Sequence, residues 1–220
     1  MILIQVIAYL MEIELLTMND FQKEIESAAK ERAYIEAEKT HNHRNFNINL
    51  YSKKMSKTKK AIIASVEKHE VDLIKISDDI WALAETAFEE NQSSKILSDY
   101  AEKQGFTVER GVAGMPTAFV ATYGSGKPVI SVLGEFDALP GISQKAEHTK
   151  SPLKEGAAGH GCGQNICGAG SLGAAIAIKE LIESGEIKGT IKFLGTPSEE
   201  KYFGKIWMVR EGLWDDVDVN

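Results

Sequence analysis

The amino-acid sequence predicts an α/β fold of three layers, in which helices cover a mostly parallel central sheet. The first 104 residues contain no glycine and no proline, so all 19 glycines and all five prolines lie in the rest of the chain. Apolar residues follow helical spacing before this point, whereas short apolar runs alternate with helical patterns after it. This alternation is typical of helices packed on both faces of one sheet. An evenly spread sandwich or barrel is excluded, because it needs turn residues every 8–12 positions or so.

Two helical regions precede the predicted sheet. Residues 61–90 carry apolar side chains at helical spacing and are interpreted as one long helix or two abutting helices. Residues 92–104 predict the next helix, with Ser93 or Ser94 as its N-cap and Gly105 just past its end.

Strands and helices alternate after Gly105. Four short runs, bounded by glycine or proline, predict strands at 106–111, 117–123, 128–134 and 189–195. The run 128–134 is apolar throughout, as in a strand that is buried on both faces of a parallel sheet. Helical patterns predict two further helices at 171–185 and 204–216.

The first quarter of the chain is interpreted as separate from the working domain. Residues 1–54 predict an N-terminal helical extension and linker, and the lysine-rich run 52–60 marks the boundary to a domain at 55–220. His41 and His43 lie in an Asn-rich stretch without a nearby acid or cysteine, so they are interpreted as loop residues and not as metal ligands.

Composition restricts the partners and the location of the protein. The chain has 25 Lys and Arg against 32 Asp and Glu, a formal net charge of −7, so no basic surplus favours nucleic acid. Two cysteines are too few for a secreted disulfide scaffold and favour a cytoplasmic location. Residues 1–11 are apolar but too short to cross about 30 Å of hydrocarbon, so no membrane partner is expected. Contact of this run with a membrane or a partner is the alternative.

Three loops carry the residues that could perform chemistry. The loops are 134–141, 156–173 and 195–205, and each follows a predicted strand or opens a predicted helix. Functional groups of open α/β sheets collect in the crevice at the carboxyl ends of the strands. An Asp, a His, a Cys and a pair of Glu residues in these loops supply what a site at that edge requires.

The pair Glu199 and Glu200 allows two interpretations. Adjacent carboxylates after a strand point in different directions, so one can hold a metal while the other moves a proton. Alternatively, Ser198 caps a helix whose positive end favours the two acids.

The cysteines also allow alternatives. Cys162 can be a ligand for a zinc-like ion, a structural residue, or a nucleophile with His160 as its base. Cys167 has no partner at ligand spacing and is interpreted as a packing residue. Three glycines lie around this segment, at Gly159, Gly161 and Gly163. They indicate a backbone that passes close to another group or adopts positive φ.

A glycine-rich motif in the second loop raises the alternative of nucleotide binding. Residues 168–173, GAGSLG, match GxGxxG and open a predicted helix. The dinucleotide fingerprint needs a strand directly before the first glycine, but HGCGQNIC stands there instead. Nucleotide binding is therefore a secondary hypothesis.

Taken together, the three loops resemble the zinc-type amidohydrolases of the aminoacylase and carboxypeptidase metallopeptidase clan. The likeness is carried by GEFDALPG, by GHGCG with GAGSLGAA, and by the PxEE, MVR and DDVD segments in the family's order. It is greatest toward the aminobenzoyl-glutamate hydrolase branch. It covers residues 55–220, whereas residues 1–54 have no counterpart in the family.

The resemblance implies metal-assisted hydrolysis of a small N-acyl amino acid such as aminobenzoyl-glutamate. The implied cofactor is one or two divalent ions, zinc or manganese, which activate a water molecule and polarise the amide carbonyl. Cys162 and Glu200 match metal ligands of the family, and Glu199 matches the general base that takes a proton from the metal-bound water. Asp137 matches an acid that supports the site without ligating the metal.

Two departures from the family pattern matter. Gln164 stands where the family has a histidine ligand, and a neutral amide oxygen suits zinc poorly, so metal binding is expected to be impaired. The family also places histidine ligands in later segments, whereas the last histidine here is His160. The resemblance therefore implies an incomplete catalytic domain with weak or no activity on its own.

A second hypothesis comes from a different functional class. The chain could be a non-catalytic remnant, or an interaction module that pairs with a separate C-terminal chain. Assembly into a homo-oligomer is the other hypothesis about its partners. A histidine-containing continuation in the reading frame would distinguish a split enzyme from a remnant.

Overall fold

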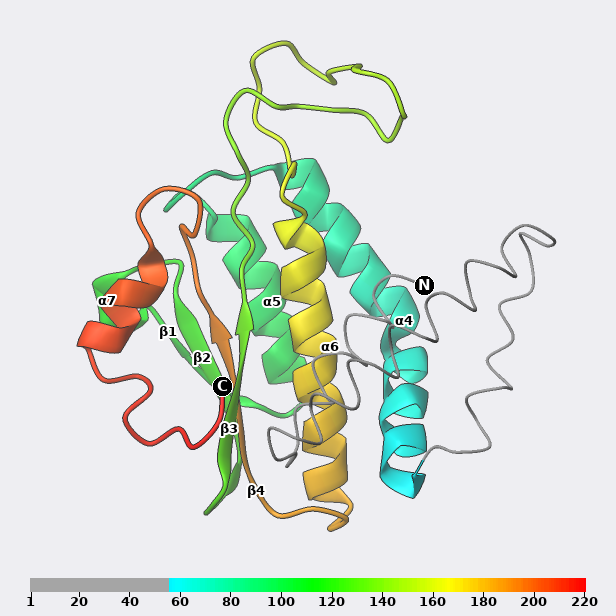
Figure 1. Ribbon diagram of the computed structural model, residues 1–220, viewed down its shortest axis with the longest axis vertical. Coiled ribbons are helices and arrows are strands. Elements are labelled where there is room, and N and C mark those ends of the chain that lie inside the picture. The colour runs from blue at the N-terminus through cyan, green and yellow to red at the C-terminus, as the bar shows by residue number, and fades with distance from the viewer. Residues whose placement is uncertain (1–55) are drawn as a thin grey trace, which may run out of the picture.

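A computed structural model describes residues 56–220, so the predicted extension at residues 1–54 lies outside the described residues. Figure 1 shows the elements in chain order. The helices are α4 (Lys57–Leu83), α5 (Asn91–Lys103), α6 (Gln164–Glu183) and α7 (Gly204–Arg210), with a short 3₁₀ turn η1 (Val112–Gly114). The strands are β1 (Thr107–Arg110), β2 (Phe119–Ser125), β3 (Val129–Gly134) and β4 (Gly189–Gly195).

Helix α4 is one continuous helix that ends earlier than the apolar spacing predicts. The Ser56 hydroxyl accepts a hydrogen bond from the Lys59 N–H and caps its start. Ala84 adopts left-handed φ/ψ and ends the helix. Beyond it Thr86 forms an isolated bridge with Ala138, which follows β3, and the chain is no longer helical.

The predicted cap of the next helix is wrong. Helix α5 begins at Asn91, so Ser93 and Ser94 lie inside its first turn. The Glu85 carboxylate accepts the N–H groups of Gln92 and Ser93 and the Ser93 hydroxyl at 2.8–3.1 Å. An acid from outside the helix therefore satisfies its first amides, which local cap preferences do not reveal.

The sheet is mixed, and the prediction of a mostly parallel sheet is wrong. Its order is β1-β2-β4-β3, and β3–β4 is its one parallel pair. The β1–β2 and β2–β4 pairs are antiparallel. Residues 111–118 reverse the chain between β1 and β2, a connection too short for a parallel crossover of a dozen or more residues. The crossover through α6 makes β3 parallel to β4.

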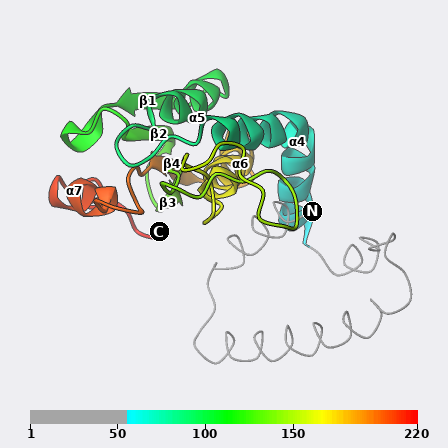
Figure 2. The same cartoon turned by 90° about the horizontal axis from the view of Figure 1, so that it is seen from above.

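Helices lie on both faces of this sheet, in agreement with the predicted layers. Helices α4, α5 and α6 cover one face, and α7 lies on the other (Figures 1 and 2). Successive side chains of a strand point to opposite faces, so alternate residues of β4 pack into the apolar cores on the two sides of the sheet. Phe193 packs with Leu172 of α6, whereas Leu194 packs with Met208 of α7.

Helix α6 is the central helix of the larger layer. It is long and apolar enough to span a membrane, yet 72% of its apolar window is buried inside the molecule. The GAGSLG motif at 168–173 lies within this helix and not in a loop between a strand and a helix. The motif therefore presents no phosphate-binding loop, and it gives no support to the hypothesis of nucleotide binding. Gly168 instead permits close packing, since an added Cβ would lie 2.9 Å from the Glu135 carbonyl oxygen.

Candidate functional site

The structure brings the three predicted loops together at the carboxyl ends of β3 and β4. Gly134 and Gly195, the last residues of these two strands, are register partners in the parallel pair. Asp137 follows β3, Glu199 and Glu200 follow β4, and Gln164 is the first residue of α6. Four of the predicted side chains therefore lie at one edge of the sheet, where β3 and β4 end and α6 begins. We call Asp137, Gln164, Glu199 and Glu200 the carboxylate cluster.

Asp137 holds the loop that carries the two glutamates. Its side chain is 1% exposed, and its two carboxylate oxygens accept the N–H groups of Glu199 and Glu200, each at 3.0 Å. Burial raises the pKa of Asp137, and these backbone hydrogen bonds oppose the shift. The contacts place Asp137 in position for the supporting role predicted for it, which stays a prediction.

Gln164 links the ends of the cluster. It is 2% exposed, and its Oε1 accepts the N–H of Asp137 at 3.1 Å. Its Nε2 donates to Glu199 Oε2 at 3.0 Å and to Glu200 Oε1 at 3.1 Å. The backbone N–H of Asp137 can only donate, so it fixes which end of the amide is oxygen.

Cys162 lies beside the cluster and is exposed. A hydrogen bond to Glu200 raises the pKa of its thiol, and the charges of Glu200, Glu199 and Glu135 raise it further. The thiol is therefore held in its protonated form at neutral pH. Cys167 is partly buried, and burial raises its pKa, in line with a packing role.

His160 does not serve Cys162 as a base. Its Nε2 lies 3.1 Å from the Ile80 carbonyl oxygen and donates to it, and its buried Nδ1 has no hydrogen-bond partner. Burial lowers the pKa of His160 and keeps the ring neutral. The hypothesis of a Cys–His nucleophile is not supported by this arrangement.

The glycines around Cys162 behave as the sequence predicts. An added Cβ at Gly159 would lie 2.6 Å from the Ile142 carbonyl oxygen, and at Gly161 it would lie 2.4 Å from Ile142 Cδ1. Gly163 has a φ of 88°, in the left-handed region, directly before α6. Close approach and positive φ are both confirmed.

The alternative in which Ser198 caps a helix is wrong. Residues 199–202 form a turn, and α7 begins only at Gly204. Ser198 has a φ of 57°, and its N–H donates to the Glu90 carboxylate at 2.8 Å.

Sequence reasoning missed Glu90. This acid is fully buried, burial raises its pKa, and its Oε2 has no hydrogen-bond partner. It stands in a segment interpreted as helical, and no motif marks it. Its partner Ser198 is 108 residues away, so local sequence carries no signal for this contact.

Comparison with known proteins identifies the family. Residues 131–219 match the family described as Peptidase family M20/M25/M40. This part of the chain is similar to peptidase family M20. The resemblance drawn from the loop motifs is therefore confirmed at the level of the family.

Related M20 proteins extend over much more sequence than this chain. The chain is 49% identical over 144 residues to one of the subunits of p-aminobenzoyl-glutamate hydrolase from Escherichia coli K12, matching 65% of this chain and 30% of that protein. It is 29% identical over 156 residues to Xaa-Arg dipeptidase of Mus musculus, with 66% and 32% covered. The chain thus spans about a third of the length of these relatives.

The fold agrees with the M20 assignment. A dinuclear metal-binding peptidase of the M20 family from Bacillus subtilis superimposes with a TM-score of 0.59 at 23% identity. The match covers 70% of this chain and 42% of that one. A part of the M20 fold is therefore present here, with its mixed four-stranded sheet.

The cluster as arranged does not fit the divalent metal that the M20 family implies. Within residues 56–220, no group of three or more His, Cys, Asp and Glu side chains is placed to hold a metal ion. The Gln164 amide turns its N–H groups toward Glu199 and Glu200, and an N–H group cannot ligate a cation.

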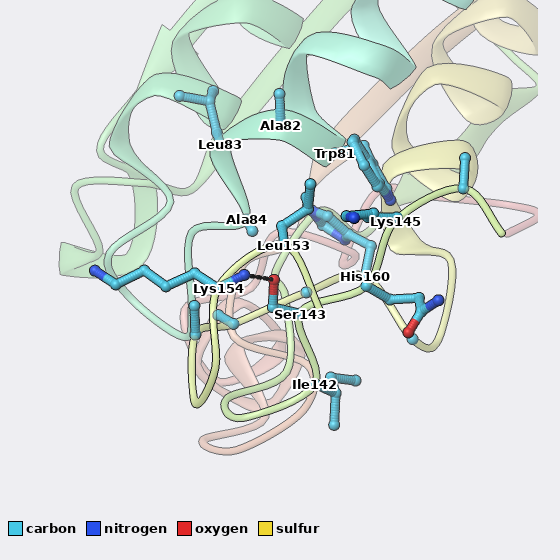
Figure 3. A pocket seen from close by; sticks show the side chains of 16 residues that line it. Trp81, Ala82, Leu83, Ala84, Ile142, Ser143, Lys145, Leu153, Lys154 and His160 are labelled. Carbon is cyan, nitrogen blue, oxygen red and sulfur yellow. Dashed lines mark hydrogen bonds between the residues drawn. The ribbon is translucent and has the colours of Figure 1, made fainter. Parts of the chain in front are cut away.

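A cavity of about 400 Å³ lies next to this edge of the M20 fold. It is formed by the end of α4 and residues 142–161, and Figure 3 shows Trp81, Leu153 and His160 around it. Lysine side chains are the charged groups in its lining, which contains no acid. Sequence reasoning missed this cavity, because its walls come from segments roughly 60 residues apart along the chain.

Proposed function

We propose that the chain is part of an M20-type amidohydrolase that cleaves the amide bond of N-acyl amino acids such as aminobenzoyl-glutamate. On its own it turns over such substrates weakly or not at all. The substrate class is supported by the 49% identity to the p-aminobenzoyl-glutamate hydrolase protein of Escherichia coli. The observation that carries the proposal is the convergence of Asp137, Glu199 and Glu200 at one edge of the sheet.

Amide hydrolysis needs a group that takes a proton from the attacking water and passes it to the leaving amine. Glu199 is proposed for this role, because it matches the general base implied by the resemblance and Asp137 holds its backbone at this edge of the sheet. Glu200, held by the other oxygen of Asp137, remains the second carboxylate of the site. Asp137 acts through these two residues and is a positioning residue.

Gln164 explains why the activity of this chain is proposed to be weak. Its amide donates to the carboxylates of both Glu199 and Glu200. These two hydrogen bonds stand where a cation shared by the two carboxylates would bind, so the cluster as arranged holds no cation to activate the attacking water. No step through a metal ion is assigned to this arrangement.

The test is hydrolysis of p-aminobenzoyl-glutamate by the full chain, measured as release of p-aminobenzoate with added Zn²⁺ or Mn²⁺. Wild type is expected to be slow, and Gln164→His is expected to raise the rate. Glu199→Gln, made in wild type and in Gln164→His, should lower the rate of hydrolysis by roughly 100-fold or more, as expected for loss of a general base. Glu70→Gln, an exposed change on α4, is the matched control. Turnover that persists in the Glu199 variants would overturn the assigned role.

A second candidate function is a non-catalytic module that pairs with a separate C-terminal chain. Apolar side chains on and beside α7 favour it, because they face solvent: Phe203 is 57% exposed, Ile206 66%, Trp207 43% and Val209 59%. A contiguous exposed apolar surface marks a protein contact.

Co-expression tests this second candidate. The portion of the Escherichia coli relative that this chain does not match is co-purified with the full chain, and complex formation is followed by size-exclusion chromatography. Ile206→Ser with Trp207→Ser should abolish the complex if α7 forms the contact. Val71→Ser is the control, because Val71 is an exposed apolar residue of α4, in the layer on the other face of the sheet. A chain that stays monomeric in the mixture removes this candidate.

A further inference from the structure

We infer that the Gln164 amide takes the position of a cation between Glu199 and Glu200, so that hydrogen bonds alone close the carboxylate cluster. The amide nitrogen lies 3.0 Å from Glu199 Oε2 and 3.1 Å from Glu200 Oε1. One neutral group thus bridges two carboxylates of adjacent residues, as a divalent ion would do.

The orientation of the amide is determined by its other contact. Oε1 of Gln164 accepts the backbone N–H of Asp137 at 3.1 Å, so the lone pairs of the side chain point away from the glutamates. A flipped amide would place its oxygen against two carboxylates and its N–H groups against another N–H. Both sets of contacts would then be repulsive, and the residue is 2% exposed, so water would not relieve them.

The other acids at this edge also accept hydrogen bonds from groups of the chain itself. Both oxygens of Asp137 accept backbone N–H groups, and Glu135 pairs with Lys205. Each carboxylate of the edge therefore has a donor, and a cation would have to displace existing hydrogen bonds to bind.

The inference concerns the same cluster as the proposed function, but it does not depend on catalysis. It predicts that the stability of the full chain does not respond to divalent cations. Thermal unfolding of wild type in EDTA, in Zn²⁺ and in Mn²⁺ should give melting temperatures that agree within about 1 °C, because a ligand stabilises only a state that it binds.

Gln164→Glu is the decisive variant, because it keeps the shape of the side chain, removes the N–H donor and adds a fourth carboxylate to the cluster. Its melting temperature should fall in EDTA and recover with Zn²⁺ or Mn²⁺. Gln164→His should gain a shift of about 5–10 °C at zinc 100-fold above its Kd. Gln104→His adds the same side chain at the C-terminal end of α5, at the opposite edge of the sheet, and should gain no such shift.

Two results would overturn the inference. One is a wild-type melting temperature that rises with zinc as much as that of Gln164→His. The other is a Gln164→Glu chain that is as stable as wild type in EDTA. If Gln164→Glu does not fold under any condition, equilibrium dialysis decides, with bound zinc per chain expected to be higher for Gln164→His than for wild type. Equal zinc content in the two would contradict the inference. No substrate enters these measurements, so a chain without turnover still answers the question.

Discussion

At the scale of single residues, the carboxylate cluster is held together by hydrogen bonds between residues that lie far apart in the sequence. Asp137 receives N–H groups from residues 62 and 63 positions away, and Gln164 reaches Glu199 over 35 positions. Hydrogen bonds to charged groups contribute about 1.5–3 kcal/mol each when buried. The geometry of the two glutamates is therefore set by one buried carboxylate.

Asp137→Asn tests this dependence. The substitution replaces one carboxylate oxygen by an N–H₂ group that faces the N–H of Glu199 or Glu200, so one buried donor loses its acceptor. We expect the free energy of unfolding to fall by about 2–3 kcal/mol, measured by urea denaturation. Asp78→Asn, an exposed change on α4, should alter it by less than about 0.5 kcal/mol. Equal effects of the two variants would contradict the role given to Asp137.

Sequence patterns could identify the cluster but not its contacts. Asp137, Gln164, Glu199 and Glu200 stand directly after strands or at the start of a helix, where an α/β sheet places its functional groups. The contacts of Gln164 with both glutamates and the burial of Glu90 depend on how distant loops pack together. This packing cannot be read from the local sequence around either residue. The hydrogen bond from the Ser198 N–H to the Glu90 carboxylate is an example, because no sequence motif contains both residues.

At the scale of elements, the apolar pattern predicted where strands and helices lie better than how they begin or how they pair. Strand β4 occupies the predicted residues, and α6 begins seven residues before the predicted helix, in a glycine-rich segment with weak helix preference. The continuous apolar run at 128–134 favours a parallel pairing, and β3 is indeed in the parallel pair. The alternation in β1 and β2 is typical of antiparallel pairs, which the structure contains.

Helix α5 offers a test at this scale. Its first N–H groups are bound by Glu85, which lies outside the helix on the segment after α4. Glu85→Ala should lower the free energy of unfolding by about 1–2 kcal/mol, as for loss of a good N-cap. Glu89→Ala, a neighbouring exposed acid without a cap contact, is the control. Urea denaturation that shows the same loss for both variants would exclude Glu85 as the cap.

At the scale of the whole molecule, a polar network ties together the three helices of the larger layer. His69 of α4 contacts Tyr100 of α5 at 3.1 Å and Glu180 of α6 at 3.2 Å, and Lys68 pairs with Glu180 at 2.7 Å. Burial acts to raise the pKa of Glu180, but hydrogen bonds from Lys68 and His69 outweigh it and lower the pKa to about 2. The layer therefore depends on an acid that must stay ionised.

This network predicts how stability depends on pH. Because the pKa of Glu180 is lower in the folded chain than its ordinary value near 4.5, its contribution is present at neutral pH. It is lost as the pH falls from about 5 toward about 2, where the carboxylate becomes protonated. Glu180→Gln should reduce the free energy of unfolding at pH 7 by about 2–3 kcal/mol, and this difference from wild type should shrink steadily toward pH 3. Glu67→Gln, an exposed acid of α4, is the control and should follow wild type closely at each pH. Urea denaturation at pH 7, 5 and 3 separates the outcomes, because a difference that stays constant with pH would show that Glu180 stabilises the layer by packing and not by its charge.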